Sequence, residues 1–148
     1  MDGFCAGGME DTVKIVNHAL RREMALPGRC EWCSKLCRKR EGAHLWGRGA
    51  GASDIRCNMI SLGSTPMMQC PCHTNSHSVC KPSRSELLAV VAKRERTTPE
   101  AIEEVVNFIR YILPKNATVS VIESAMIDLS DEGRKLAQRE FLSAGIMT

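Results

Sequence analysis

Apolar residues recur at intervals of three and four on both sides of a cysteine-rich central segment. In residues 9–25, Val13, Val16, Leu20 and Met24 share one helical face, acidic residues begin the segment and arginines lie near its end. This arrangement is typical of an amphipathic helix whose charges complement the helix dipole. We therefore predict an N-terminal helix over residues 9–25.

The same spacing returns after the cysteine-rich segment. Ser83 and Glu86 form a capping-box pattern ahead of an apolar segment that ends at Glu95. The clearest stripe in the sequence occupies residues 99–113, at positions Ile102, Val105, Val106, Ile109, Ile112 and Leu113. This stripe predicts a second, strongly amphipathic helix.

Two further helices are predicted after Pro114. One begins near Ser120, and the other follows the N-cap residue Ser130 and ends at Gly145. The connections between these segments are short, which is typical of a helical hairpin or a small bundle of three or four elements.

The centre of the chain lacks helical periodicity. Residues 57–69 carry no charge and predict a short strand or hairpin with a turn at 63–66. Residues 44–52 are rich in glycine but lack the preceding strand and following helix of a phosphate-binding loop, so we predict a flexible loop.

The composition favours helices packed on helices. Apolar residues make up 43% of the 148 residues but aromatic residues only 4%, so the core must be aliphatic. The predicted fold is mainly α, with a small irregular zinc-binding module between an N-terminal helix and a C-terminal three- to four-helix hairpin or bundle. The corresponding divisions are residues 1–27, 28–81 and 82–148.

Candidate metal ligands concentrate in the predicted module. Seven of the eight cysteines and three of the four histidines lie between Cys30 and Cys80. A gap of two residues between cysteines lets a tight turn direct both thiolates at one ion. The predicted ligands are Cys30, Cys33, Cys37, Cys57, Cys70, Cys72, His77 and Cys80.

These ligands fit one or two zinc ions. One site would contain Cys30 and Cys33, and a second would contain Cys72, His77 and Cys80. The residues that compete for the remaining positions are Cys37, His44, Cys57, Cys70 and His73. Their order matches neither a Cys2His2 finger nor a ribbon of two clean CxxC pairs.

The choice of zinc depends on the cellular compartment. No stretch approaches the roughly 18 consecutive apolar residues that span a bilayer, and the first residues lack the order of a signal peptide. We therefore expect an intracellular protein without membrane contact, in the cytoplasm and also in the nucleus or nucleolus. Reduced cysteines there favour metal over disulfides. An iron–sulfur cluster is the alternative, because Cys30, Cys33 and Cys37 supply three close thiolates.

The net charge of +3 is unevenly distributed. Residues 29–56 hold seven Lys or Arg against three acids, whereas residues 97–148 hold five against eight. A basic region that contains tryptophans is typical of a nucleic-acid surface on which bases stack. The predicted nucleic-acid-binding residues are Arg38, Lys39, Arg40, Arg48, Trp32 and Trp46. The first three also suit a nuclear or nucleolar address, and the simpler interpretation is a solvated turn.

Two other functions fit less well. A helix-turn-helix in residues 83–113 would present Glu100, Glu103 and Glu104 to phosphates. A catalytic zinc needs a nearby general base, yet residues 55–85 contain no Glu, so we do not expect an enzyme.

The small size, the basic cluster beside cysteines and the helical C-terminal part resemble the small cysteine-rich, zinc-binding regulatory proteins of positive-strand RNA plant viruses. The resemblance is one of layout, because their Cys-Gly-x-x-His signature is absent: His73 follows Cys72, and Lys81 follows Cys80. It implies a role as an RNA-silencing suppressor or pathogenicity factor.

We therefore expect a zinc-stabilised regulatory protein that binds nucleic acid, RNA in preference to duplex DNA. It is also expected to self-associate through the stripe in residues 99–113 or through the last helix. The competing interpretation is an adaptor that contacts a host protein, or a transcription or antitermination factor, in which zinc serves folding alone.

Overall fold

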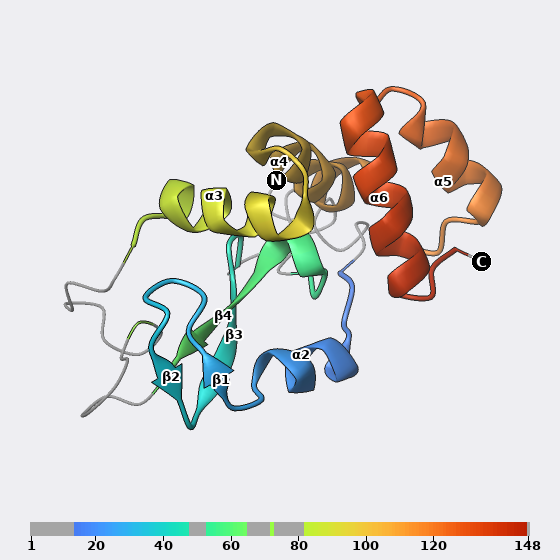
Figure 1. The fold of residues 1–148 in the computed structure, drawn as a ribbon. Helices are drawn as coiled ribbons and strands as arrows, with labels where there is room; N and C mark the ends of the chain where they lie inside the picture. Colours follow the sequence, from blue (N-terminus) through green and yellow to red (C-terminus); the bar gives the residue numbers. More distant parts are fainter. Residues whose placement is uncertain (1–13, 48–52, 65–71, 73–81, 148) are drawn as a thin grey trace, which may run out of the picture.

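The computed structural model describes residues 14–47, 53–64, 72 and 82–147. These residues form five α-helices, a π-helical turn, a short 3-10 helix and two antiparallel strand pairs (Figure 1). The prediction of a mainly α fold with a small cysteine-containing part is confirmed in this outline. The elements in order are α2 (His18–Met24), β1 (Gly28–Arg29), β2 (Leu36–Cys37), β3 (Arg40–His44), η1 (Arg56–Asn58), β4 (Met59–Gly63), α3 (Arg84–Glu95), α4 (Pro99–Asn107), η2 (Phe108–Ile112), α5 (Val119–Met126) and α6 (Asp131–Ser143).

The first helix is shorter than predicted. Residues 14–17 are not helical, and α2 begins only after Asn17, whose side chain accepts a hydrogen bond from the Leu20 amide at 3.1 Å. The amides of Ile15 and Asn17 instead donate to side chains of Ser53 and Asp54, at 3.1 and 2.8 Å. These long-range bonds keep the segment extended despite its helical periodicity. Residues 9–13 lie outside the described part.

The cysteine-containing part is more regular than predicted. β1 pairs with β2, and β3 pairs with β4 over five residues each, from Arg40 opposite Gly63 to His44 opposite Met59. Within the described residues, the uncharged segment therefore pairs with an upstream strand and not with itself. The last part of the predicted turn at 63–66 lies outside these residues.

The predicted flexible loop is wrong for residues 44–46. His44 ends β3, and the side chains of Leu45 and Trp46 are buried. The Trp46 amide donates to Oδ1 of Asn58 at 2.9 Å, and the Asn58 amide group donates to the Trp46 carbonyl at 3.1 Å. These two hydrogen bonds attach residues 45–46 to η1.

The predicted helix ends of the C-terminal half are confirmed. The capping box of Ser83 and Glu86 is formed at α3, and the Ser130 hydroxyl accepts from the Gly133 amide at 3.0 Å at the start of α6. Gly145, with φ of +75°, follows the end of α6. The predicted second helix divides into α4 and η2, where the hydrogen-bond pattern widens to a π-helix before Pro114.

One hydrophobic cluster connects the strand pairs to the helices. It includes Cys30, Leu62, Val91, Phe108 and Phe141, and the two phenylalanine rings lie 6.1 Å apart between centroids. The stripe of residues 99–113 is buried in this cluster except at Ile112, so it offers no face to a second copy of the chain. Self-association through the last helix stays a prediction.

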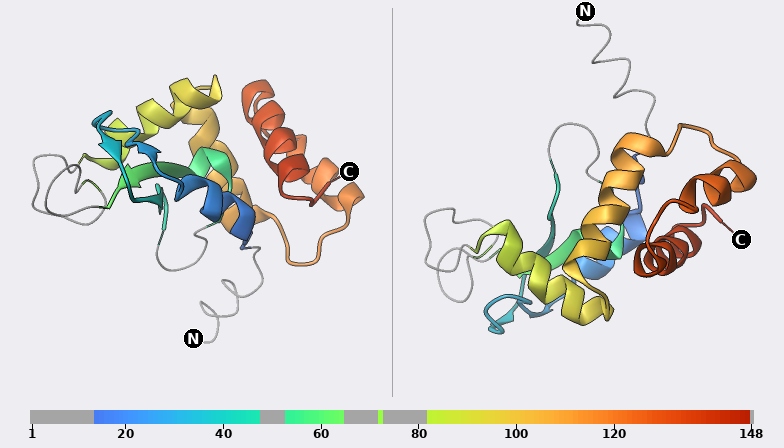
Figure 2. Two further views of the ribbon diagram at one scale, coloured as in Figure 1. Left: turned by 60° about the horizontal axis from the view of Figure 1, so that its bottom comes forward. Right: turned by 90° about the horizontal axis from the view of Figure 1, so that it is seen from above.

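The elements form an elongated arrangement. The β1–β2 pair lies at one end and α5 and α6 lie at the other, with α3 and α4 between them (Figure 2). Within the described ranges, no helix is both long and apolar enough to cross a bilayer.

Candidate metal centre

A tight turn between β1 and β2 carries Cys30 and Cys33. The Cys30 amide donates to the Lys35 carbonyl and the Ser34 amide donates to the Cys30 carbonyl, both at 2.9 Å. Ser34 has a φ of 66°, which reverses the chain directly after Cys33. The turn therefore presents both thiols on the same side, as the CxxC spacing predicts.

Cys72 completes a cluster of three thiols. The Sγ atoms of Cys30, Cys33 and Cys72 all lie within 4.8 Å of one another, and Cys30 and Cys72 are buried. None of the five described cysteines forms a disulfide. The structure brings Cys72, which was predicted for a second site, together with Cys30 and Cys33. His77 and Cys80, its predicted partners, lie outside the described residues.

The donor set fits a soft metal ion. Thiolates bound tetrahedrally to zinc, with Zn–S of about 2.3 Å, lie about 3.8 Å apart. Three sulfur atoms within 4.8 Å of one another are compatible with such a site. Thiolate sulfur favours zinc, copper(I) and iron–sulfur clusters over magnesium or calcium. The three residues can therefore hold a metal ion, and a structural tetrahedral site has room for a fourth ligand.

The other predicted ligands lie elsewhere or outside the described residues. The thiol of Cys37 is buried and donates to the Lys35 carbonyl at 3.3 Å. His44 places its Nε2 atom 2.8 Å from Oδ1 of Asp54. The predicted ligands outside the described residues are Cys70, His73, His77 and Cys80.

Cys57 is fully buried on η1, beside a buried glutamate. Burial, and then the carboxylate of Glu140, raise the pKa of the Cys57 thiol well above its usual value. A protonated thiol is a poor metal ligand. The structure therefore places Cys57 in the packing between η1 and α6, and not in the three-thiol cluster.

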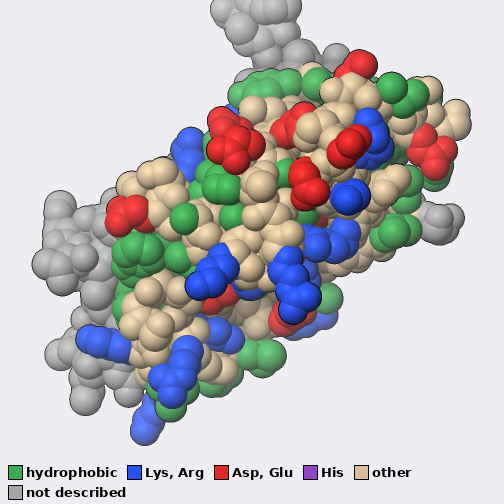
Figure 3. Space-filling model, turned by 45° about the horizontal axis from the view of Figure 1, so that its top comes forward, with side chains coloured by type: hydrophobic (Ala, Val, Ile, Leu, Met, Phe, Trp, Pro, Cys, Tyr) green, Lys and Arg blue, Asp and Glu red, His purple; other side chains and the backbone are tan. Residues whose placement is uncertain are grey.

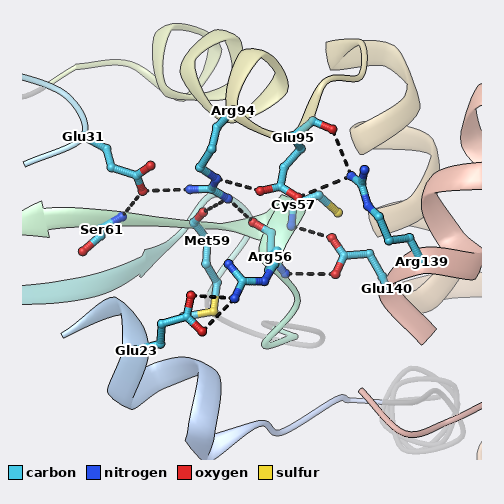
Figure 4. Close-up of polar contacts among 10 residues, drawn as sticks. All are labelled: Glu23, Glu31, Arg56, Cys57, Met59, Ser61, Arg94, Glu95, Arg139 and Glu140. Carbon is cyan, nitrogen blue, oxygen red and sulfur yellow. Dashed lines mark hydrogen bonds and ion pairs between the residues drawn. The ribbon is translucent and has the colours of Figure 1, made fainter. Parts of the chain in front are cut away.

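A partly buried ion pair holds the turn of Cys30 and Cys33 in place. Glu31, between Cys30 and Cys33, accepts from the Ser61 amide at 2.8 Å and from Nη1 of Arg94 at 2.7 Å (Figure 4). Arg94 also donates to the carbonyls of Arg56 and Met59, at 2.6 and 3.0 Å. This single guanidinium on α3 thus connects the turn, η1 and β4.

Three glutamates surround Arg94 and η1. Burial alone would lower the Arg94 pKa, but the carboxylates of Glu31 and Glu95 outweigh it and raise the pKa. Glu140 on α6 accepts from the amides of Arg56 and Cys57, at 3.1 and 2.8 Å (Figure 4). The contacts of Glu31 with Arg94 and of Glu140 with η1 join residues more than sixty positions apart, so no local pattern in the sequence indicates them.

The predicted nucleic-acid-binding residues differ in accessibility. Arg38 and Lys39 are exposed beside β2, and neither forms an ion pair with a described residue. Arg40 instead donates to the carbonyls of Leu26 and Arg29, at 2.6 and 2.8 Å, and so stabilises β1. On the face drawn in Figure 3, Lys and Arg side chains gather at the β1–β2 end and along the lower edge, whereas acidic side chains gather in the upper half.

The two tryptophans are less open than the sequence suggests. Trp46 is only 8% exposed, and the Arg84 guanidinium lies 5.1 Å from the centre of its ring. Trp32 is partly buried against the core, and Arg48 lies outside the described residues. Base stacking on either tryptophan stays a prediction.

Comparison of the chain with models of protein families, with curated proteins and with solved structures found no match.

Proposed function

We propose that this is a zinc-stabilised regulatory protein that binds single-stranded RNA through the basic hairpin formed by residues 28–40. The main support for this proposal is the position of Arg38 and Lys39. Both side chains are exposed directly beside a hairpin whose turn contributes Cys30 and Cys33 to the three-thiol cluster. A fixed set of charges loses less conformational entropy on meeting phosphates than a disordered basic run.

The charge of the hairpin is not balanced within it. It contains five basic residues, Arg29, Lys35, Arg38, Lys39 and Arg40, and a single acid, Glu31. That acid is already engaged by Arg94 from α3. The exposed basic side chains therefore retain their attraction for a polyanion.

Zinc is the proposed metal because three thiolates and a reducing compartment favour it. We propose that the fourth ligand comes from the residues that follow Cys72, of which His73, His77 and Cys80 are of suitable type. Thiolate-rich closed sites stabilise a fold and do not expose a reactive water. The proposed role of the metal is therefore structural, and the protein is proposed not to be an enzyme.

A salt-titrated binding measurement tests this function. The variant Arg38→Gln/Lys39→Gln removes two proposed phosphate contacts, and Arg22→Gln/Lys115→Gln removes two exposed charges elsewhere. The slope of log affinity against log salt is negative for phosphate contacts. We expect it to become less negative by about 1.4 in the first variant and to stay unchanged in the second. Equal slopes in both variants, at full zinc content, would refute the hairpin as the RNA surface.

Exposed apolar side chains favour a second candidate, a protein-interaction adaptor. Val119 and Val121 on α5, Ile127 directly after α5 and Leu142 on α6 are at least 40% exposed. For an adaptor, RNA affinity would be absent at every salt concentration. The resemblance to plant-virus regulatory proteins favours RNA binding over the adaptor function.

A further inference from the structure

A large open pocket lies between β3 and the helices α3 and α4. Its volume is about 1020 Å³, at the upper end of the roughly 300–1,000 Å³ of small-molecule sites. The polar and aromatic residues that line it are His44, Trp46, Arg84, Asn107, Arg110 and Tyr111. Cys72 also lines it, so the pocket borders the metal centre.

Two arginines of the pocket are stacked on aromatic rings. The Arg84 guanidinium lies 5.1 Å from the ring centre of Trp46, and that of Arg110 lies 5.0 Å from the ring centre of Tyr111. Stacking holds a guanidinium in one plane while its N–H groups at the edge stay available to an acceptor. Neither arginine forms an ion pair with a described residue.

The basic side chains that line the pocket favour binding of an anion. Its lining contains two arginines and a histidine but no Asp or Glu among the described residues. Asp54, the carboxylate in contact with the lining residue His44, also accepts from Arg21 and from the Asn17 amide. A site built from arginine forks without acids suits phosphate oxygens.

We propose that this pocket binds a nucleotide unit of single-stranded RNA, with phosphate against the Arg110 and Arg84 side chains and a base stacked on Tyr111. Tyr111 is 65% exposed at the rim, which leaves ring surface for a base. This inference rests on the proposed RNA-binding function and adds a second contact region to the basic hairpin. A free mononucleotide offers the same chemistry, so the test includes both sources.

The test measures binding of a short labelled oligouridylate and of UMP to the full chain by fluorescence anisotropy and calorimetry. We expect Arg110→Gln and Tyr111→Ala each to weaken oligouridylate binding about tenfold. Tyr111→Phe preserves the ring and Lys115→Gln removes a neighbouring exposed charge outside the pocket, so both should bind like the wild type. Zinc content and helical circular dichroism show that each variant is folded.

The outcomes separate this inference from the proposed function. Oligouridylate binding that falls in Arg38→Gln/Lys39→Gln but stays unchanged in Arg110→Gln and Tyr111→Ala would overturn the pocket alone. Arg110-dependent binding of UMP without oligouridylate binding would support a nucleotide pocket and refute the RNA function. A folded wild-type chain that binds neither probe would overturn both.

Discussion

Nη1 of Arg94 lies 2.7 Å from Oε1 of Glu31, a residue of the turn that carries Cys30 and Cys33. The same carboxylate oxygen accepts the Ser61 amide, so α3 and β4 both fix the position of the turn. The two side chains are only about one-fifth exposed. The geometry of the candidate metal centre therefore depends on an ion pair between residues 63 positions apart in the sequence.

We predict that Arg94→Met lowers the free energy of unfolding by about 2 kcal/mol, because it leaves Glu31 without its charged partner. This figure is lower than for a fully buried pair, since water screens the exposed fraction. Urea unfolding followed by circular dichroism measures the change. The control Arg22→Met, on an exposed arginine of α2, should stay within about 0.5 kcal/mol of the wild type, and an equal loss in both variants would contradict the account.

Loss of the three-thiol cluster is predicted to unfold the strands and the helices together. One hydrophobic cluster includes Cys30 and Cys72 as well as Phe108 and Phe141, so no separate helical core remains. Unfolding of Cys33→Ser should therefore show one transition, with tryptophan fluorescence and helical circular dichroism changing at the same urea concentration. Two separated transitions would instead support independent units at residues 28–81 and 82–148.

Local patterns in the sequence predicted local structure well. The capping box of Ser83 and Glu86 and the turn at Cys30 and Cys33 each depend on residues three positions apart. The third thiol, Cys72, was predicted as a ligand but not beside Cys30 and Cys33, because ligand spacing does not determine which cysteines meet. Pairing of β3 with β4 and the Glu140 contacts also escaped prediction, since they depend on tertiary packing.

We predict that Gly133→Ala destabilises α6, although alanine normally stabilises a helix by about 1 kcal/mol relative to glycine. A Cβ atom at Gly133 would overlap the carboxylate of Glu104 on α4. That carboxylate accepts from the amide and hydroxyl of Ser130, at 3.0 and 2.6 Å, and joins α4 to α6.

The double variant Gly133→Ala/Glu104→Ala provides the control for this prediction. Without the carboxylate, the overlap is gone and the alanine should regain its usual helix-stabilising effect. Thermal unfolding of the four members of the cycle measures the coupling. A stabilising Gly133→Ala in the presence of Glu104 would contradict the structure.

The buried carboxyl groups of Glu140 and Asp54 are predicted to affect the free energy of unfolding in opposite ways as pH changes. Burial raises the pKa of Glu140 above 4.5, although the hydrogen bonds from the Cys57 and Arg56 amides lower it. The folded state therefore binds this proton more tightly, and the contribution is lost as pH rises through the raised pKa. Relative to Glu140→Gln, the wild type should lose stability from about pH 4.5 upward.

Asp54 titrates in the other direction. Burial would raise its pKa, but hydrogen bonds from Asn17, His44 and Arg21 outweigh burial and lower it below 3.8. Its contribution is present above that pH and is lost as pH falls through the lowered pKa. Urea midpoints of the wild type, Glu140→Gln and Asp54→Asn across this range test both signs, and parallel profiles for all three would refute them.

Elemental analysis of the purified chain tests the three-thiol metal centre most directly, with Cys72→Ser and Cys57→Ala as matched variants. We predict about one zinc per chain in the wild type and in Cys57→Ala, and a loss of most zinc in Cys72→Ser. A chelator should also lower the unfolding midpoint of the wild type. Less than about half a zinc per chain, with unfolding unaffected by the chelator, would contradict the account.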